Sequence, residues 1–394
     1  MQDFFRMADV FMFQLPRKII FGNGSIDRLG EEARILFGGG RVLLISDKGV
    51  IAAGLAEKAV LRLREQNYEV EIFDQVEPDA PIRLVLEGAR RARDWKADII
   101  VGLGGGSSID TAKAVSFMAT YDGDIKDCLG INQVKRPGLP RIFVPTTAGT
   151  GSELSHTFVL ADDESGDKIT SYSPHTFADL ALIDPALTSS MPAKVTAESG
   201  LDAFSHALES FVTVKANPLS DLFSRRGIEI IAKNLPKAYS QGARNLEARY
   251  AMCFGVCMGA MAIRSSGIGA IHAVSYPVAM KYHLSHGLAI ALMMPAVMEF
   301  NLMANREKYA SVAEAMGVRM TGLSTHDAAR ASVEAVRSLT TEIGLPTRLR
   351  DAGVNQDDFA DFARVVVKRY AHHLANNPRQ VHEEDIVSIY QAAW

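Results

Sequence analysis

The segment ADIIVGLGGGSSID, residues 97–110, gives the clearest indication of architecture in this chain. Its first half is an apolar, β-branched run, typical of a strand buried on both faces of a parallel sheet. Three consecutive glycines follow, and helical periodicity then runs from Ser107 to Ala119. Glycines at such a junction let a ligand approach the backbone, and the N–H groups that begin the helix attract an anion such as pyrophosphate. The segment therefore predicts a strand–loop–helix unit that binds a phosphate-bearing cofactor.

The glycine loop departs from two common phosphate-binding motifs. Ser107 stands where the usual dinucleotide fingerprint has its third glycine, and no Gly-Lys-Ser/Thr follows. The best acidic partner for a ribose, Asp47, precedes the loop in the sequence. A second loop, PTTAGTGSE at 145–153, follows another predicted strand, where parallel sheets bind ligands. A turn without a ligand is the alternative for either loop, but two such loops on successive strands favour a cofactor site.

Strands and helices alternate through the first half of the chain. Apolar or alternating runs predict strands at 41–47, 68–74, 97–103, 141–145 and 179–184. Helical periodicity predicts helices at 51–66, 82–95 and 107–119. A hairpin is expected at 158–173. From about Pro192, Ala, Met, Leu and Glu at helical spacing replace the β-branched runs. We therefore expect an α/β domain with a parallel sheet at 1–188 and an all-α domain at 189–394.

Composition narrows the class of protein. The 394 residues are 47% hydrophobic and 22% charged, enough for two domains with full cores. A net charge of −4 gives no electrostatic support for a nucleic-acid partner. The longest apolar run, 287–298, is short and contains Pro295, so no membrane span is expected. The chain has three cysteines, Cys128, Cys253 and Cys257. This number is too small for a disulfide framework and favours a reducing compartment such as the cytoplasm.

Four side chains form a candidate metal site. Asp202 and His206 stand four residues apart, so a helix would present both on one face, and His272 and His286 follow downstream. One carboxylate with three imidazoles suits Fe²⁺, Zn²⁺, Co²⁺ or Mn²⁺. An Asp/His pair at this spacing is also typical of a surface or capping pair. The glycine loop supplies a second, independent piece of chemistry, and the two together favour a metal-dependent enzyme.

Four motifs resemble the iron-containing (group III) alcohol dehydrogenases in order and spacing; they lie at 104–110, 145–153, 202–206 and 286–295. The resemblance implies a dinucleotide-binding domain, an all-helical domain and the interconversion of a small primary alcohol and its aldehyde. It implies Fe²⁺, with Zn²⁺ or another divalent ion as alternatives, bound by Asp202, His206, His272 and His286. It also implies cofactor contacts from Asp47, Asp79, Gly105, Gly106, Ser107, Asp110, Thr146, Thr147, Thr150, Thr157 and Lys168. A carboxylate at position 47 would repel a 2′-phosphate, so NAD is expected over NADP.

One departure from the family concerns the proton. Tyr276 stands where relatives carry a second histidine that is proposed to help move it. Tyr276 or His283 could substitute, although a partly exposed loop residue is the alternative for His283. The neighbouring histidines His372 and His373 lie among polar helical residues and are expected to face solvent.

A second departure is Arg264, two helical turns before His272, where relatives have a small uncharged residue. Ile263 replaces the aromatic residue that precedes that position. Arginine binds carboxylate, sulfonate or phosphonate through two parallel hydrogen bonds, so a substrate with an anionic tail is one hypothesis. An ordinary ion pair with a nearby acid is the alternative.

Other functions stay open at this point. A metal-dependent lyase or cyclase of the dehydroquinate synthase type would share the architecture, but it needs several basic residues that are scarce near the predicted ligands. A zinc-dependent glycerol dehydrogenase and a non-catalytic metal or nucleotide sensor are further alternatives. The expected partners are a small alcohol or aldehyde and further copies of the chain, as a homodimer or higher homo-oligomer, with the strand near 18–21 pairing across the interface. No nucleic acid or membrane is expected as a partner.

Overall fold

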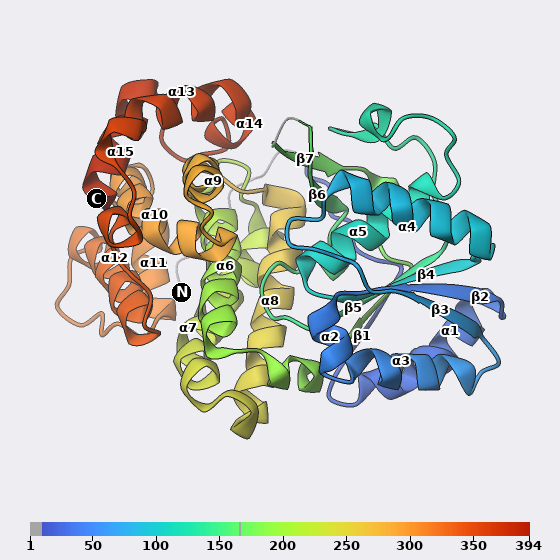
Figure 1. The fold of residues 1–394 in the computed structure, drawn as a ribbon. Coiled ribbons are helices and arrows are strands. Elements are labelled where there is room, and N and C mark those ends of the chain that lie inside the picture. Colours follow the sequence, from blue (N-terminus) through green and yellow to red (C-terminus); the bar gives the residue numbers. More distant parts are fainter. Residues whose placement is uncertain (1–9, 165–166) are drawn as a thin grey trace. The chain divides into compact units, whose positions relative to one another are not determined.

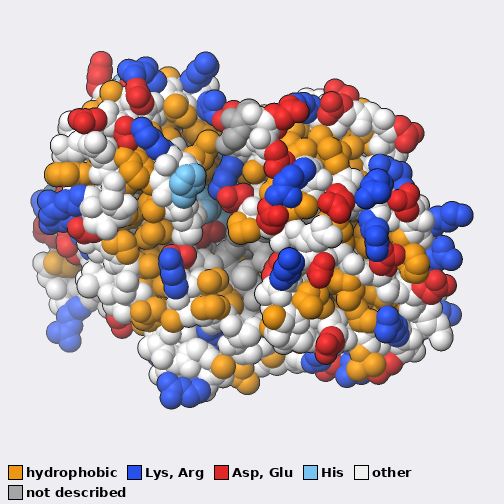
Figure 2. All heavy atoms as spheres, in the orientation of Figure 1, with side chains coloured by type: hydrophobic (Ala, Val, Ile, Leu, Met, Phe, Trp, Pro, Cys, Tyr) orange, Lys and Arg blue, Asp and Glu red, His pale blue; other side chains and the backbone are white. Residues whose placement is uncertain are grey.

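The computed structural model describes residues 10–164 and 167–394, and the chain forms two compact units. The α/β unit spans Leu15–Met191, and the helical unit spans Pro192–Trp394 together with residues 10–14. In that N-terminal part, Phe13 stacks on Phe223 with ring centroids 5.8 Å apart. On the face drawn in Figure 2, basic and acidic side chains are interspersed.

A six-stranded parallel sheet forms the centre of the α/β unit, with helices on both faces (Figure 1). The strand order is β1-β8-β5-β4-β2-β3, and all five pairings are parallel. The parallel sheet expected from the sequence is confirmed. The strands are β1 Lys18–Phe21, β2 Arg41–Ile45, β3 Glu69–Phe73, β4 Ile99–Gly104, β5 Arg141–Pro145 and β8 Leu180–Ile183.

The covering helices follow the sequence pattern with one correction. They are α1 Leu29–Phe37, α2 Lys48–Ala52, α3 Leu55–Arg64, α4 Ile82–Trp95 and α5 Gly106–Met118. The single helix predicted at 51–66 is wrong, because Gly54 adopts a φ of 73° and separates α2 from α3. The predicted hairpin consists of β6 Thr157–Ala161 and β7 Lys168–Tyr172, which pair antiparallel. Residues 165–166 of its turn lie outside the described part.

The sheet has a topological switch point between β2 and β4. Strand β2 pairs with β3 on one side and with β4 on the other, so the chain continues in opposite directions from it. Open α/β sheets bind ligands beyond the carboxyl ends of the strands at such a point. Asp47 lies just after β2 and Gly105 directly follows β4. The fold therefore brings the predicted ribose ligand and the glycine loop to the place where this architecture binds a cofactor.

The helical unit is built around α6, which is buried over most of its length and packs against α7, α8 and α10. An all-helical second unit is the expected architecture and is confirmed. Its helices are α6 Ala193–Val212, α7 Pro218–Gln241, α8 Leu246–Ser266, α9 Ala270–Tyr282, α10 His286–Asn301, α11 Arg306–Ala315, α12 Thr325–Glu342, α13 Phe359–Arg369, α14 Ala371–Leu374 and α15 Glu383–Ala393.

Two segments of this unit, Leu246–Ser266 and His286–Ala304, are long and apolar enough to cross a membrane by length and composition. Of their most apolar windows, 56% and 72% are buried inside the protein. Both segments contain charged residues, among them Glu247 and Glu299, so neither is an uninterrupted apolar run. Their burial is that of core helices.

Candidate functional site

Three helices supply the candidate metal ligands. Asp202 and His206 lie one turn apart on α6, His272 lies in the first turn of α9, and His286 is the first residue of α10. A side chain at Gly287 would collide with the backbone carbonyl of Glu198, so this glycine lets the start of α10 approach α6 closely. That approach brings His286 to Asp202.

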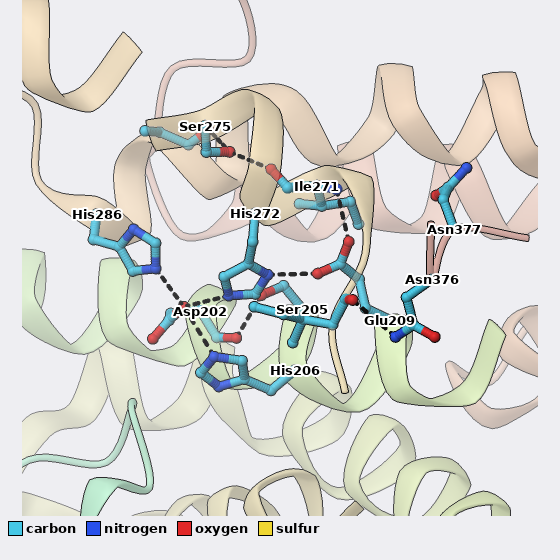
Figure 3. A network of polar contacts seen from close by, with 12 residues as sticks. Asp202, Ser205, His206, Glu209, Ile271, His272, Ser275, His286, Asn376 and Asn377 are labelled. Atoms are coloured by element: carbon cyan, nitrogen blue, oxygen red, sulfur yellow. Dashed lines mark hydrogen bonds and ion pairs between the residues drawn. The ribbon is translucent and has the colours of Figure 1, made fainter. Parts of the chain in front are cut away.

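The four predicted ligands converge on one point (Figure 3). Asp202 Oδ1 lies 3.5 Å from Nε2 of His286 and 3.7 Å from Nε2 of both His206 and His272. Four ligands about 2.1 Å from one ion in a tetrahedron are roughly 3.4 Å apart. These three distances suit atoms that share an ion and are long for direct hydrogen bonds. Asp202, His206 and His272 form the tightest group, with ligand atoms that all lie within 4.8 Å of one another.

Two buried atoms of the site lack hydrogen-bond partners. Asp202 Oδ1 and His272 Nε2 are buried, and neither finds a partner within the described residues. The side chains of these two residues are only 4% and 2% exposed. Buried polar atoms are normally paired, so both atoms call for a further partner. A divalent cation between them would provide it, and the residues present therefore fit the metal that the motifs imply.

Glu209 contacts His272 at Nδ1, the ring nitrogen that does not face Asp202. Its Oε2 lies 2.5 Å from Nδ1 of His272, and its Oε1 accepts a hydrogen bond of 2.6 Å from the N–H of Ile271. The carboxylate holds the proton of His272 on Nδ1, which leaves the Nε2 lone pair directed at Asp202. Sequence analysis did not single out Glu209, although it lies seven residues after Asp202 and three after His206, on the same helix face.

Burial and mutual attraction set the charges of the ligands. Burial alone would favour a neutral Asp202, but His206, His286 and His272 outweigh it and hold the pKa of this carboxyl well below its usual range. Burial lowers the pKa of His206 to about 4, against the pull of Asp202. For His272, Glu209 and Asp202 overcome burial and raise the pKa to about 9. Metal binding requires the neutral imidazole of His272, so affinity for the ion would fall as the pH is lowered.

Polar contacts tie four of the eleven predicted cofactor residues, Asp47, Asp79, Ser107 and Lys168, to the start of α5. Asp47 accepts hydrogen bonds from the Val50 N–H at 3.0 Å and from Ser108 Oγ at 3.1 Å. The N–H of Asp79 donates to Ser107 Oγ at 3.1 Å, and Lys168 Nζ donates to Asp79 Oδ1 at 2.6 Å. These contacts bring together residues that follow β2, β3 and β4 and the first residue of β7.

The glycine loop and the threonine loop lie against each other. The N–H of Thr146 donates to the carbonyl of Gly104 at 2.9 Å. A Cβ placed on Gly105 would lie 3.4 Å from the side chain of Thr147, and one on Gly106 would lie 3.0 Å from that of Thr150. The two loops predicted to bind the cofactor therefore form one surface of glycines and threonines.

Asp110 and Thr157 make contacts within the protein. Asp110 accepts hydrogen bonds from Ser152 Oγ at 2.5 Å and from the N–H of Val159 at 3.0 Å. Lys113, which is fully buried, donates to Ser152 Oγ at 2.5 Å and to the Thr157 carbonyl at 2.6 Å. Asp110 and Lys113 thus tie the threonine loop and β6 to α5. Sequence analysis missed Lys113, whose signal is a single lysine in an otherwise small and apolar stretch of helix.

The departures from the family surround the metal ligands. The Tyr276 ring stacks on His286, with centroids 5.5 Å apart and planes 11° apart. Arg264 is half-buried in the last turn of α8; its Nε donates to the Ala260 carbonyl at 3.3 Å, and burial lowers its pKa to about 10. The charge of Arg264 acts to lower the pKa of His206, so the two lie near each other. His283 ends α9 with a φ of 50° and is exposed.

One predicted surface residue is buried. His372 is exposed as expected, but His373 is only 8% exposed, and the expectation that it faces solvent is wrong. The ring centroid of His373 lies 6.3 Å from those of both Tyr276 and Tyr370. The reason is tertiary, since the short helix α14 packs against α9.

Comparison with known proteins identifies the family that these features match. Residues 16–185 match the model for iron-containing alcohol dehydrogenase, and residues 196–394 match that for the C-terminal part of the Fe-containing alcohol dehydrogenase family. A 1,3-propanediol dehydrogenase of Klebsiella pneumoniae is 37% identical, covering 98% of this chain and 99% of the relative. A sulfoacetaldehyde reductase of Bilophila wadsworthia is 33% identical, covering 97% and 98%. A crystal structure of 1,3-propanediol oxidoreductase superimposes with a TM-score of 0.95 at 37% identity, covering 98% of this chain and 100% of that one.

Proposed function

Because the chain belongs to the iron-containing alcohol dehydrogenases, a family of alcohol and aldehyde oxidoreductases, we propose that it interconverts a small primary alcohol and its aldehyde with NAD(H). The observation that carries the proposal is the convergence of Asp202, His206, His272 and His286 around two unpartnered buried atoms. A lyase or cyclase of the dehydroquinate synthase type would need several basic residues around its substrate, and the family match supports an alcohol or aldehyde substrate instead.

These four side chains would hold the metal, with Fe²⁺ as the family's ion and Zn²⁺ as the main competitor. When bound, the ion supplies Lewis-acid stabilisation of negative charge on the substrate oxygen. Asp202 contributes one negative charge to the ligand shell, and His206 and His286 contribute nitrogen ligands. Glu209 orients His272, which fixes the geometry that the other ligands complete.

NAD is the proposed redox partner, and the α/β unit would bind it. The N-terminus of α5 offers backbone N–H groups and a positive helix end to the pyrophosphate. Gly105 and Gly106 leave room for its approach, and the threonine loop beside them offers hydroxyl groups. The carboxylate of Asp47 lies at the switch point, where it would bind ribose hydroxyls and repel the 2′-phosphate of NADP.

Arg264 supports a narrower proposal, that the substrate carries an anionic group. Arg264 lies on α8, which packs against α6, the helix of Asp202 and His206, and its charge acts on the pKa of His206. A planar fork of N–H donors suits a sulfonate, carboxylate or phosphonate. A relative that is a sulfoacetaldehyde reductase makes a sulfonate the first group to test.

Location and assembly are further proposals. The three cysteines are buried and none forms a disulfide, which supports a reducing compartment such as the cytoplasm. Strand β1 is an edge strand of the sheet, which supports pairing with a second copy in a homodimer. Light scattering of the purified protein tests the dimer, since a monomeric mass at micromolar concentration would contradict it.

Absorbance of reduced nicotinamide tests the function. Protein stripped with a chelator and reloaded with Fe²⁺ should form NADH from NAD⁺ with at least one short alcohol in a panel, and the stripped protein should not. His206→Ala should abolish the reaction, whereas His326→Gln on α12 should not change it. Binding of NAD⁺ without turnover by the loaded protein would instead favour a sensor.

A further inference from the structure

We propose that His373 and His372 carry the proton of the substrate hydroxyl between the buried metal centre and solvent. The inference rests on the proposed function, because only an alcohol or aldehyde substrate supplies or consumes that proton. Tyr276 stands where the family has its histidine, so the phenol ring leaves this chain without an imidazole at that position.

His373 has the properties of a proton carrier in the resting protein. It is only 8% exposed, and its Nε2 has no hydrogen-bond partner within the described part of the chain. Burial, with further repulsion from His372 and His272, holds its pKa well below the usual value, so the ring is neutral and has a free lone pair. A buried nitrogen without a partner is uncommon and calls for a functional or structural reason.

The rings form a continuous series from a metal ligand to water. His286 stacks on Tyr276 at 5.5 Å, and Tyr276 lies 6.3 Å from His373, measured between ring centroids. The centroids of His373 and His372 are 3.9 Å apart, and His372 is exposed. All these residues belong to the helical unit, on α9, α10 and α14. The series therefore leads from the ligand set to the surface within one compact unit.

Imidazole suits this task better than the phenol beside it. The ordinary pKa of a tyrosine is about 10, whereas that of a histidine is about 6.5, closer to the pH at which an enzyme works. A ring held neutral by burial accepts a proton and passes it on without retaining it. Tyr276 lies beside both His286 and His373, so the ligand and the carrier flank the same ring.

The proton balance of the reaction gives His373 a defined step. When an alcohol is oxidised, the carbon-bound hydrogen leaves as hydride to NAD⁺, and the hydroxyl hydrogen leaves as a proton. Nε2 of His373 accepts that proton, the ring returns to its neutral form by releasing a proton to His372, and His372 releases it to water. Reduction of the aldehyde takes the same route in reverse, with one proton drawn from solvent.

Stopped-flow measurement of proton release tests the proposal in metal-loaded protein. A pH-indicator dye reports proton release while absorbance reports NADH in the same turnover. In wild type the two should keep pace. In His373→Gln, proton release and kcat should fall about 100-fold, with partial rescue by added imidazole and with metal content and Tm unchanged. The exposed His372→Gln should slow proton release several-fold, and His326→Gln should not affect it.

Four outcomes would overturn the proposal. Proton release at the wild-type rate in His373→Gln would exclude the carrier, and loss without imidazole rescue would indicate a structural role. If Tyr276→Phe slowed proton release as much as His373→Gln does, and His372→Gln did not slow it, the proton transfer would belong to the phenol of Tyr276. If wild type oxidises no alcohol at all, the proposed function itself has failed, and this inference fails with it.

Discussion

Glu209 Oε2 lies 2.5 Å from Nδ1 of His272, so an acid on α6 orients a proposed metal ligand on α9. Replacing it with glutamine should weaken metal binding by about 10- to 100-fold, because the ligand loses the partner that fixes its tautomer. Isothermal titration of the stripped protein with Zn²⁺ measures the effect. Asp221→Asn is the matched control, because it removes another carboxylate of the helical unit, one paired with Lys308 at 2.7 Å, away from the ligands. Equal affinity in Glu209→Gln and wild type would contradict this account.

Two substitutions in the glycine loop should have different effects, one on cofactor binding and the other on protein stability. Gly105 has a φ of −79°, and a side chain there makes only ordinary contacts with Thr147, so Gly105→Ala should fold normally. Its methyl group would occupy the space left for the pyrophosphate, and we expect KM for NAD⁺ to rise at least tenfold. Gly104 has a φ of 152°, and a side chain there would collide with Ser108. Gly104→Ala should therefore lower stability by about 1–3 kcal/mol. A Gly105→Ala variant with unchanged KM would remove the loop from the cofactor site.

Glu153 should make stability depend on pH. It is buried, and burial raises the pKa of its carboxyl to about 7, against opposing effects of a backbone hydrogen bond and Lys113. The unfolded chain loses this proton near pH 4.5, whereas the folded protein keeps it until about pH 7. The folded state therefore binds more protons in that window, and stability falls as the pH rises through it.

Glu153→Gln should remove this loss. The gain in unfolding free energy over wild type should be about 3 kcal/mol larger at pH 8 than at pH 4.5, as measured by urea denaturation. Glu57→Gln, on the exposed surface of α3, serves as the control. A gain that does not change between the two pH values would show that Glu153 titrates normally.

Arg264 should discriminate between substrates by charge. Arg264→Ala should lower kcat/KM for 2-hydroxyethanesulfonate by about 10- to 100-fold, because charge-assisted hydrogen bonds are lost. For 1-propanol the change should be less than about threefold, since this alcohol has no anionic group that could bind the guanidinium. Arg264→Lys keeps the charge without the planar fork and should give an intermediate loss. Equal losses for the two alcohols would end the anionic-substrate proposal.

The sequence predicted the parts of this protein that depend on local pattern. The buried strands, the glycine loop and the Asp202–His206 pair each have a short-range signature, and the structure brings the four proposed ligands together. The break at Gly54 was missed because apolar periodicity continues across it. Glu209 and Lys113 lie on helices whose periodicity gives no sign of their partners, which come from other elements. The burial of His373 depends on the packing of α14 against α9, which no local pattern contains.

Anomalous diffraction at the iron absorption edge tests the central claim most directly. Crystals of the stripped protein reloaded with Fe²⁺ should show one strong peak per chain, bonded to Asp202, His206, His272 and His286. A peak elsewhere, a peak bonded to fewer than three of these side chains, or full activity in crystals without any peak would contradict the account.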